Sequence, residues 1–165
     1  MINIEDYRIL VTDFDGVHTD NKVLVSSDGQ ELVSCSRSDG IAYDYLRKKQ
    51  ITSIILSSET NSVVKERANK LKIKFYGGVS NKLDFLERIL LENLKSSLDK
   101  VIYIGNDLND YLVMEKCGLK VCPSDSHPRI IEISDFVIQK KGGDGVIRSL
   151  IEDVFEIDLI EMLYR

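Results

Sequence analysis

Short apolar runs alternate with longer segments of helical periodicity along this chain. Continuous apolar runs rich in β-branched residues are typical of strands buried on both faces, and apolar residues every three or four positions predict helices. Strands are predicted over 8–12, 51–56, 74–76, 101–104, 119–122 and 136–138. Helices are predicted over 39–49, 61–71, 82–94, 111–117 and 146–155, with a helical turn over 130–133. This alternation predicts a three-layer α/β fold with a central parallel sheet.

A different pattern lies between the first strand and the first helix. Two short β-type runs, 22–26 and 31–34, flank an Asp28-Gly29 pair, which predicts a β-hairpin. With no linker-like stretch or repeat, we expect residues 1–165 to form a single domain from which this hairpin, at about 20–35, protrudes. A lone hairpin is marginally stable in water, so we expect it to serve in assembly; the alternative is a free surface flap.

Composition narrows the class of protein. The 22 Lys and Arg residues against 27 Asp and Glu residues give a net charge of −5, which argues against a nucleic-acid partner. No apolar run approaches the length of a membrane span, and the first ten residues do not form a secretory signal. Three cysteines without CxxC spacing argue against a disulfide framework or a zinc site. We expect a cytoplasmic protein with a small-molecule substrate and no membrane partner.

Polar side chains follow the first strand, at the sheet edge where α/β proteins bind ligands. Asp13 and Asp15 stand two apart, and Gly16 then lets the chain turn. One carboxylate of such a pair can attack phosphorus while the other acts as general acid and base. The alternative is a polar strand end with two solvated acids.

Three further polar segments of the sequence are candidates for the same site. The Ser57-Ser58-Glu59 run can hold a phosphoryl oxygen or simply cap the next helix. Lys82 can offset negative charge at the site or lie on the surface. The segment 105–110, Gly-Asn-Asp-Leu-Asn-Asp, offers the oxygen ligands that Mg²⁺ prefers, or forms an Asx-rich turn.

Taken in order, these motifs resemble the haloacid dehalogenase (HAD) superfamily of phosphatases over nearly the whole chain. The resemblance implies a Rossmann-like sheet, Mg²⁺ as cofactor, and phosphoryl transfer through an aspartyl-phosphate. It implies that Asp13 is the nucleophile, Asp15 the acid and base, Ser57 the phosphate-holding hydroxyl and Lys82 the motif lysine. It places the metal on Asp13, the backbone carbonyl of Asp15 and the 106–110 loop, with Asn106 and Asp107 as candidate ligands.

One position departs from the family pattern. Members usually carry Asp directly after the loop glycine, whereas this chain has Asn106. An amide oxygen can still bind Mg²⁺ but brings no charge, so metal affinity is expected to fall. Asp107 or Asp110 would then have to compensate.

The short stretch between the first two motifs leaves no room for a cap domain. This resembles the capless phosphatases of 3-deoxy-keto-sugar-acid phosphates, which include 3-deoxy-manno-octulosonate (KDO) 8-phosphate phosphatases and nonulosonate 9-phosphate phosphatases. In that group the hairpins of four subunits form a barrel and a neighbour completes each active site. The resemblance therefore implies a homotetramer.

The choice of substrate depends on the second motif. At this motif the octulosonate enzymes carry a run similar to Thr-Gly-Arg. This chain has Glu59 at the third position of the run, and in this it resembles the nonulosonate enzymes. Arg67 and Lys70 lie three apart on the next helix and can share a face that holds a sugar carboxylate. Ordinary surface ion pairs are the alternative. We also expect Ser58 and Asp110 to contact the substrate.

These features predict a Mg²⁺-dependent phosphatase of a 2-keto-3-deoxy nonulosonate 9-phosphate, either KDN 9-phosphate or N-acylneuraminate 9-phosphate. The first alternative is a KDO 8-phosphate phosphatase. A nonspecific phosphatase is another. An alternative of a different class is a weakly active or inactive oligomerisation module that partners a CMP-sugar cytidylyltransferase.

Overall fold

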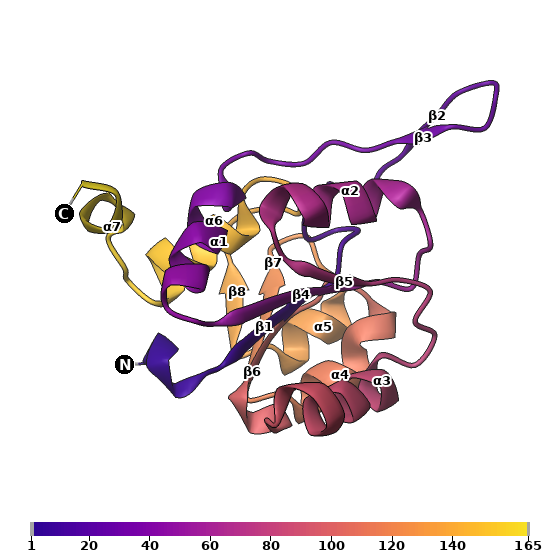
Figure 1. The fold of residues 1–165 in the computed structure, drawn as a ribbon. Coiled ribbons are helices and arrows are strands. Elements are labelled where there is room, and N and C mark those ends of the chain that lie inside the picture. The colour runs from indigo at the N-terminus through magenta and orange to yellow at the C-terminus, as the bar shows by residue number, and fades with distance from the viewer. Residues whose placement is uncertain (1, 165) are drawn as a thin grey trace.

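The computed structural model describes residues 2–164 and places a six-stranded parallel sheet at the centre of the chain (Figure 1). The strand order is β5-β4-β1-β6-β7-β8, so the chain winds outward in both directions from β1. This confirms the predicted α/β class. The strands are β1 (Ile9–Thr12), β4 (Thr52–Leu56), β5 (Lys74–Tyr76), β6 (Val101–Ile104), β7 (Leu119–Pro123) and β8 (Phe136–Ile138).

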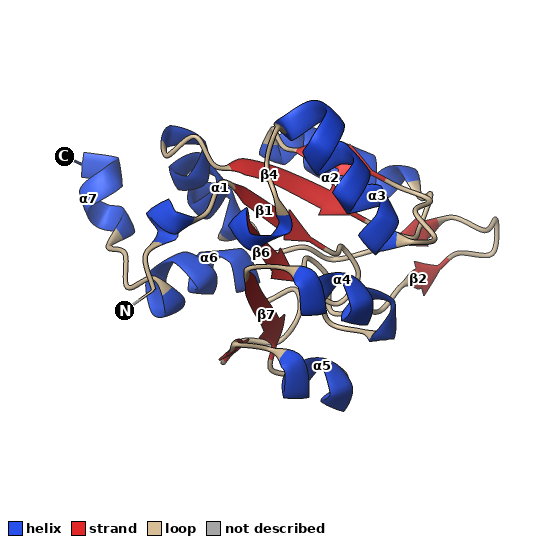
Figure 2. Cartoon of the chain, turned by 90° about the horizontal axis from the view of Figure 1, so that it is seen from below, coloured by secondary structure: helices blue, strands red, loops and turns tan. Residues whose placement is uncertain are grey.

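Helices cover both faces of the sheet, as Figures 1 and 2 show from two directions. Side chains alternate along β1, so that Leu10 packs in one apolar cluster while Ile9 and Val11 pack in the other. One layer contains α1 (Asp39–Lys48), α2 (Ser62–Leu71) and α6 (Val146–Ser149). The opposite layer contains α3 (Lys82–Ile89), α4 (Tyr111–Lys116) and α5 (Pro128–Ile133).

Two predicted helices change geometry before they end. The helix predicted over 82–94 is α3 followed by a wider π-helical turn, Leu90–Leu94. The helix predicted over 146–155 is α6 followed by a second such turn, Leu150–Val154. A further helix, α7 (Leu159–Tyr164), lies near the N-terminal end of the chain. Short 3₁₀ turns span Ile4–Asp6, Leu98–Lys100 and Leu108–Asp110.

The predicted hairpin is present and projects from the side of the molecule opposite the two termini (Figure 1). Its strands are β2 (Leu24–Val25) and β3 (Glu31–Leu32). Both are exposed, and Leu24 keeps 74% of its surface accessible while Leu32 keeps 58%. The hairpin therefore presents apolar side chains that the described part of a single copy leaves exposed.

Among residues 2–164, no helix combines the length and the apolar character that crossing a bilayer requires.

Candidate active site

The candidate site lies at the carboxyl edge of the sheet because β1 pairs directly with β4 on one side and β6 on the other. Thr12, the last residue of β1, is opposite Ile55 and Ile104 in this register. The residues that follow these strands therefore meet at one edge. They line a cavity of about 110 Å³, here called the carboxylate pocket, which includes Asp13, Asp15, Ser57, Glu59, Asn106 and Asp107.

Asp13 is buried and held at both carboxylate oxygens. Its Oδ1 accepts a hydrogen bond from the Phe14 N–H at 2.6 Å, and its Oδ2 lies 2.8 Å from Nζ of Lys82. Burial and the nearby Asp110 carboxylate raise the pKa of Asp13 to about 7, against the lowering effect of Lys82. A fixed carboxylate facing a pocket is suited to nucleophilic attack.

Lys82 is buried at the first residue of α3 and bridges two carboxylates. Its Nζ lies 2.8 Å from Asp13 and 2.7 Å from Asp110. Burial lowers the pKa of the Lys82 ammonium, but the two carboxylates outweigh that effect and raise it overall. The surface-lysine alternative is therefore wrong for Lys82.

Asp110 lies beneath the carboxylate pocket and not in its wall, a position that the sequence did not predict. It is fully buried and does not line the carboxylate pocket. Its Oδ1 accepts hydrogen bonds from Lys82 and from the Tyr103 hydroxyl, while its Oδ2 accepts from the backbone N–H of Asn106. The expected substrate contact by Asp110 is corrected to a role beneath the site, because all of these partners come from the protein interior.

Asp15 is half-buried and lines the pocket beside Asp13. Its Oδ1 accepts a hydrogen bond from the Thr19 hydroxyl at 3.3 Å. Desolvation raises the pKa of Asp15, and the bond from Thr19 opposes this shift. A carboxyl group with a raised pKa at the edge of a pocket is suited to exchange a proton with a bound substrate.

Ser57 is buried, directly follows β4 and lines the carboxylate pocket. Its hydroxyl accepts a hydrogen bond from the N–H of Glu59, so the turn after β4 fixes its position. Ser58 and Glu59 are exposed and line the same pocket. The cap of α2 is Asn61 and not a serine of this run, which leaves Ser57 available to a ligand.

Asn106 and Asp107 differ in burial although they are adjacent. The Oδ1 atom of Asn106 is buried and makes no hydrogen bond to any residue of the described range, 2–164. Asp107 is exposed and its carboxylate caps the 3₁₀ turn by accepting from the Leu108 N–H. An unpartnered buried oxygen beside Asp13 and Asp15 fits a hard cation such as Mg²⁺. Within residues 2–164 no cluster of three His, Cys, Asp or Glu side chains forms a metal site, so such a site needs the Asn106 amide or backbone carbonyls.

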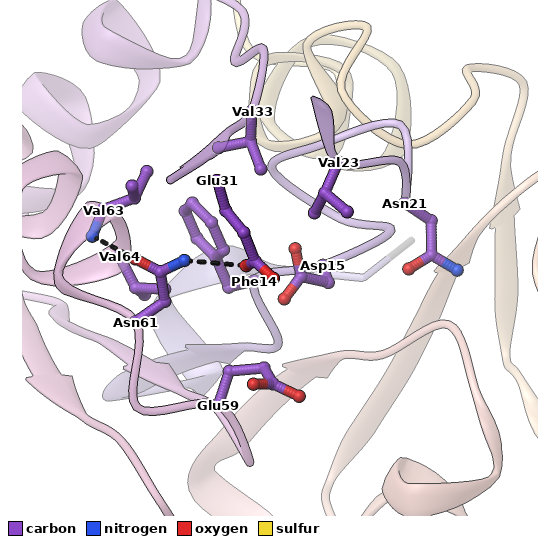
Figure 3. Close-up of a pocket in the computed structure, with 10 residues that line it drawn as sticks. All are labelled: Phe14, Asp15, Asn21, Val23, Glu31, Val33, Glu59, Asn61, Val63 and Val64. Carbon is purple, nitrogen blue, oxygen red and sulfur yellow. Dashed lines mark hydrogen bonds between the residues drawn. The ribbon is translucent and has the colours of Figure 1, made fainter. Parts of the chain in front are cut away.

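A second cavity, of about 310 Å³, opens between the hairpin and the start of α2 and is here called the hairpin pocket (Figure 3). It shares Asp15, Asn21 and Glu59 with the carboxylate pocket, so the two pockets adjoin at these residues. Valine side chains form part of its wall, and Glu31 reaches from β3 to accept a hydrogen bond from Asn61. Of the residues that the structure describes, no Lys or Arg lines this pocket.

The structure brings Arg67 and Lys70 together, as the helix spacing predicted, but not beside Asp13. Both line a separate hollow of about 360 Å³ with Arg37, here called the basic hollow. Arg67 is half-buried and donates a hydrogen bond to the Ser36 carbonyl. Within one copy, these two cations therefore lie outside both pockets around Asp15.

Sequence reasoning missed residues that support the site from below. The Thr19 hydroxyl bonds to Asp15, and the Tyr103 hydroxyl bonds to Asp110. His18 is buried and stacks between Phe14 and Tyr43. The sequence feature that could have identified these residues was a hydroxyl or imidazole side chain beside apolar residues. A polar group that is buried with them needs a hydrogen-bond partner.

Comparison with known proteins places this geometry in a family. The model of haloacid dehalogenase-like hydrolases matches residues 18–150. The 3-deoxy-D-manno-octulosonate 8-phosphate phosphatase of Escherichia coli (strain B / BL21-DE3) is 35% identical over 151 residues, which cover 91% of this chain and 80% of that enzyme.

Two solved structures share the fold closely. The 3-deoxy-D-manno-octulosonate 8-phosphate phosphatase of Yersinia pestis superposes with a TM-score of 0.86 at 32% identity, over 93% of this chain and 84% of that one. The Moraxella catarrhalis enzyme, in complex with magnesium, phosphate and KDO, gives 0.87 at 25% identity, over 93% and 88%. The relatives favour the octulosonate alternative over the nine-carbon interpretation drawn from Glu59. The chain belongs to the haloacid dehalogenase-like hydrolase family.

Proposed function

We propose that this protein is a phosphatase that hydrolyses 3-deoxy-octulosonate 8-phosphate to the free sugar acid and inorganic phosphate. The observation that carries the proposal is the buried Asp13–Lys82 pair at 2.8 Å, in which Asp13 lines a pocket together with Asp15 and Ser57. An oligomerisation module would gain no stability from this pair, because burying a lysine and a carboxylate removes the hydration of both charges. The identity to octulosonate phosphatases supports the substrate class.

The mechanism uses Asp13 and Asp15 in sequence. A carboxylate oxygen of Asp13 attacks phosphorus, and the bond from phosphorus to the sugar oxygen breaks. Asp15 donates its proton to that oxygen, so the sugar acid leaves as an alcohol. Asp15 then removes a proton from water, which attacks phosphorus of the aspartyl-phosphate and restores Asp13.

Lys82 and Ser57 stabilise the phosphoryl group during both steps. The ammonium of Lys82 offsets the charge shared by Asp13 and the phosphoryl oxygens. The Ser57 hydroxyl donates to a phosphoryl oxygen from the end of the neighbouring strand, β4. Asp13, the carbonyl of Asp15 and the amide oxygen of Asn106 would hold Mg²⁺, with Asp107 reaching it through water. Bound Mg²⁺ would neutralise negative charge between the phosphate and Asp13.

The substrate's carboxylate needs a cation that a single copy does not offer in this region. Asp15, Glu31 and Glu59 make the hairpin pocket acidic, and no Lys or Arg between residues 2 and 164 lines it. We propose that a neighbouring copy completes the site of a homotetramer. The exposed apolar hairpin supports this, because contact with other copies would bury Leu24, Val25 and Leu32.

Phosphate release from paired substrates, with Mg²⁺ present, tests the function. KDO 8-phosphate is expected to be turned over faster than KDN 9-phosphate or N-acetylneuraminate 9-phosphate. The Asp13→Asn variant is the control and is expected to release no phosphate while it keeps its oligomeric state. Faster turnover of a nine-carbon substrate would reinstate the interpretation based on Glu59. Equal inactivity of wild type and variant would favour the oligomerisation module.

A further inference from the structure

We propose that Tyr103 is a positioning residue, whose hydroxyl holds Asp110 and thereby fixes the Lys82 ammonium beside Asp13. The proposal rests on the phosphatase function proposed above, and it adds a residue that does not touch the substrate. It concerns a strand position where an apolar side chain would ordinarily suffice.

Tyr103 lies at the third position of β6 and is fully buried. Its ring packs in the apolar cluster that joins the sheet to α3 and α4, together with Leu86 and Val113. A phenylalanine would fill this space with the same ring. The hydroxyl is therefore not explained by packing, and a buried hydroxyl costs stability unless it is hydrogen-bonded.

Among residues 2–164, the Tyr103 hydroxyl has one hydrogen-bond partner, Asp110, which belongs to the site. It donates to Oδ1 of Asp110 at 2.9 Å, and the same oxygen accepts from Nζ of Lys82 at 2.7 Å. The other oxygen of Asp110 accepts the Asn106 N–H at 3.0 Å. Burial and the Asp110 carboxylate raise the pKa of Tyr103 well above its usual value, so the hydroxyl remains a donor.

The position of the Lys82 ammonium follows from a competition between two carboxylates. Asp13 and Asp110 lie at 2.8 and 2.7 Å from Nζ, so neither contact is much shorter than the other. The hydrogen bond from the Tyr103 hydroxyl stabilises part of the negative charge on the Asp110 carboxylate. Without it, Asp110 attracts Lys82 more strongly, and the ammonium moves away from Asp13 and from the phosphoryl group.

The test is Tyr103→Phe, which removes one oxygen and keeps the ring. We expect kcat to fall about tenfold, as ~1.4 kcal/mol of lost hydrogen bonding to a charged group implies, with KM within about twofold of wild type. Tyr43→Phe is the matched control, because Tyr43 is also buried and its hydroxyl bonds to His18 rather than to Asp110. That variant is expected to lose similar thermal stability and to keep its kcat.

Crystal structures provide a readout that does not depend on activity. In Tyr103→Phe the distance from Lys82 Nζ to Asp13 Oδ2 is expected to lengthen beyond hydrogen-bonding reach, about 3.5 Å. An unchanged distance, an unchanged kcat, or an equal loss in Tyr43→Phe would overturn the proposal. Wild-type inactivity with every phosphate ester would instead refute the proposed function. Should Tyr103→Phe not fold, Asp110→Asn tests the same competition by removing the charge that competes with Asp13. In that variant Lys82 Nζ is expected to stay within hydrogen-bonding reach of Asp13 Oδ2, and a contact lengthened beyond about 3.5 Å would overturn the proposal.

Discussion

A Cβ atom on Gly16 would lie 2.0 Å from the Nδ2 atom of Asn106. The loop that follows β1 and the loop that follows β6 therefore touch at these two residues, and only glycine permits the approach. Gly16 also has a φ of +79°, which side chains rarely adopt. This contact places the amide of Asn106 beside the carboxylates of Asp13 and Asp15.

Gly16→Ala is therefore expected to displace Asn106 and to lower kcat/KM by about 10- to 100-fold, because small misplacements at a reacting centre are costly. Phosphate release at several Mg²⁺ concentrations measures the effect. Gly29→Ala is the matched control, since Gly29 has a φ of +81° but open space around its Cβ position. Equal losses in the two variants would attribute the effect to backbone strain rather than to Asn106.

Asn106→Asp is expected to strengthen Mg²⁺ binding, since it adds a charge to a buried ligand oxygen. The Mg²⁺ concentration for half-maximal activity should fall roughly tenfold. With a chelator present, the same variant should unfold at a lower temperature than wild type, because a further buried carboxylate then lacks a cation. Asn109→Asp adds the same charge at an exposed position of the pocket and should change neither quantity much. A variant with unchanged Mg²⁺ dependence would remove Asn106 from the metal site.

His18 is expected to make the stability of the protein sensitive to acid. Burial and Arg67 lower its pKa to about 3 from the ordinary value of 6.5. Between these values the unfolded chain binds a proton that the folded chain does not, so the free energy of unfolding falls as pH drops below about 6.5. The slope from this one group reaches at most ~1.4 kcal/mol per pH unit.

Urea unfolding of wild type and His18→Leu between pH 7.5 and 4.5 tests this expectation. The variant loses the titrating group and also the contacts of Nε2 with Thr12 and Tyr43. It should therefore be less stable at pH 7.5 but lose less stability on acidification. Parallel pH profiles for the two proteins would show that His18 does not contribute.

The hairpin should carry the assembly of the protein. Leu24→Lys combined with Leu32→Lys places charges where apolar side chains would pack against another copy, and is expected to yield monomers in sedimentation experiments. Activity toward KDO 8-phosphate should fall in parallel, since a neighbour is proposed to complete the site. Leu91→Lys changes an equally exposed leucine elsewhere and should leave the oligomer intact. A wild-type monomer with full activity would refute this part of the proposal.

The sequence alone determined most of the architecture. The strands predicted at 74–76, 101–104 and 136–138 coincide with β5, β6 and β8, and the helix predicted at 61–71 begins one residue later. Such elements are readable because hydrophobic periodicity is local and repeats along each segment. The strand ends that bear Asp13, Ser57 and Asn106 followed from the same pattern, since parallel strands end at a common edge.

Only the tertiary structure decided which polar groups of a loop face the site. Asp107 and Asp110 are acidic residues of the same loop, and the sequence pattern does not distinguish them. The 3₁₀ turn that joins them leaves Asp107 exposed and buries Asp110 against Lys82. Arg67 and Lys70 share a helix face as the spacing predicted, but the packing of α2 directs that face away from Asp13. The direction in which a side chain points depends on how its helix or loop packs in three dimensions. The pattern of residue types along the chain does not specify that packing.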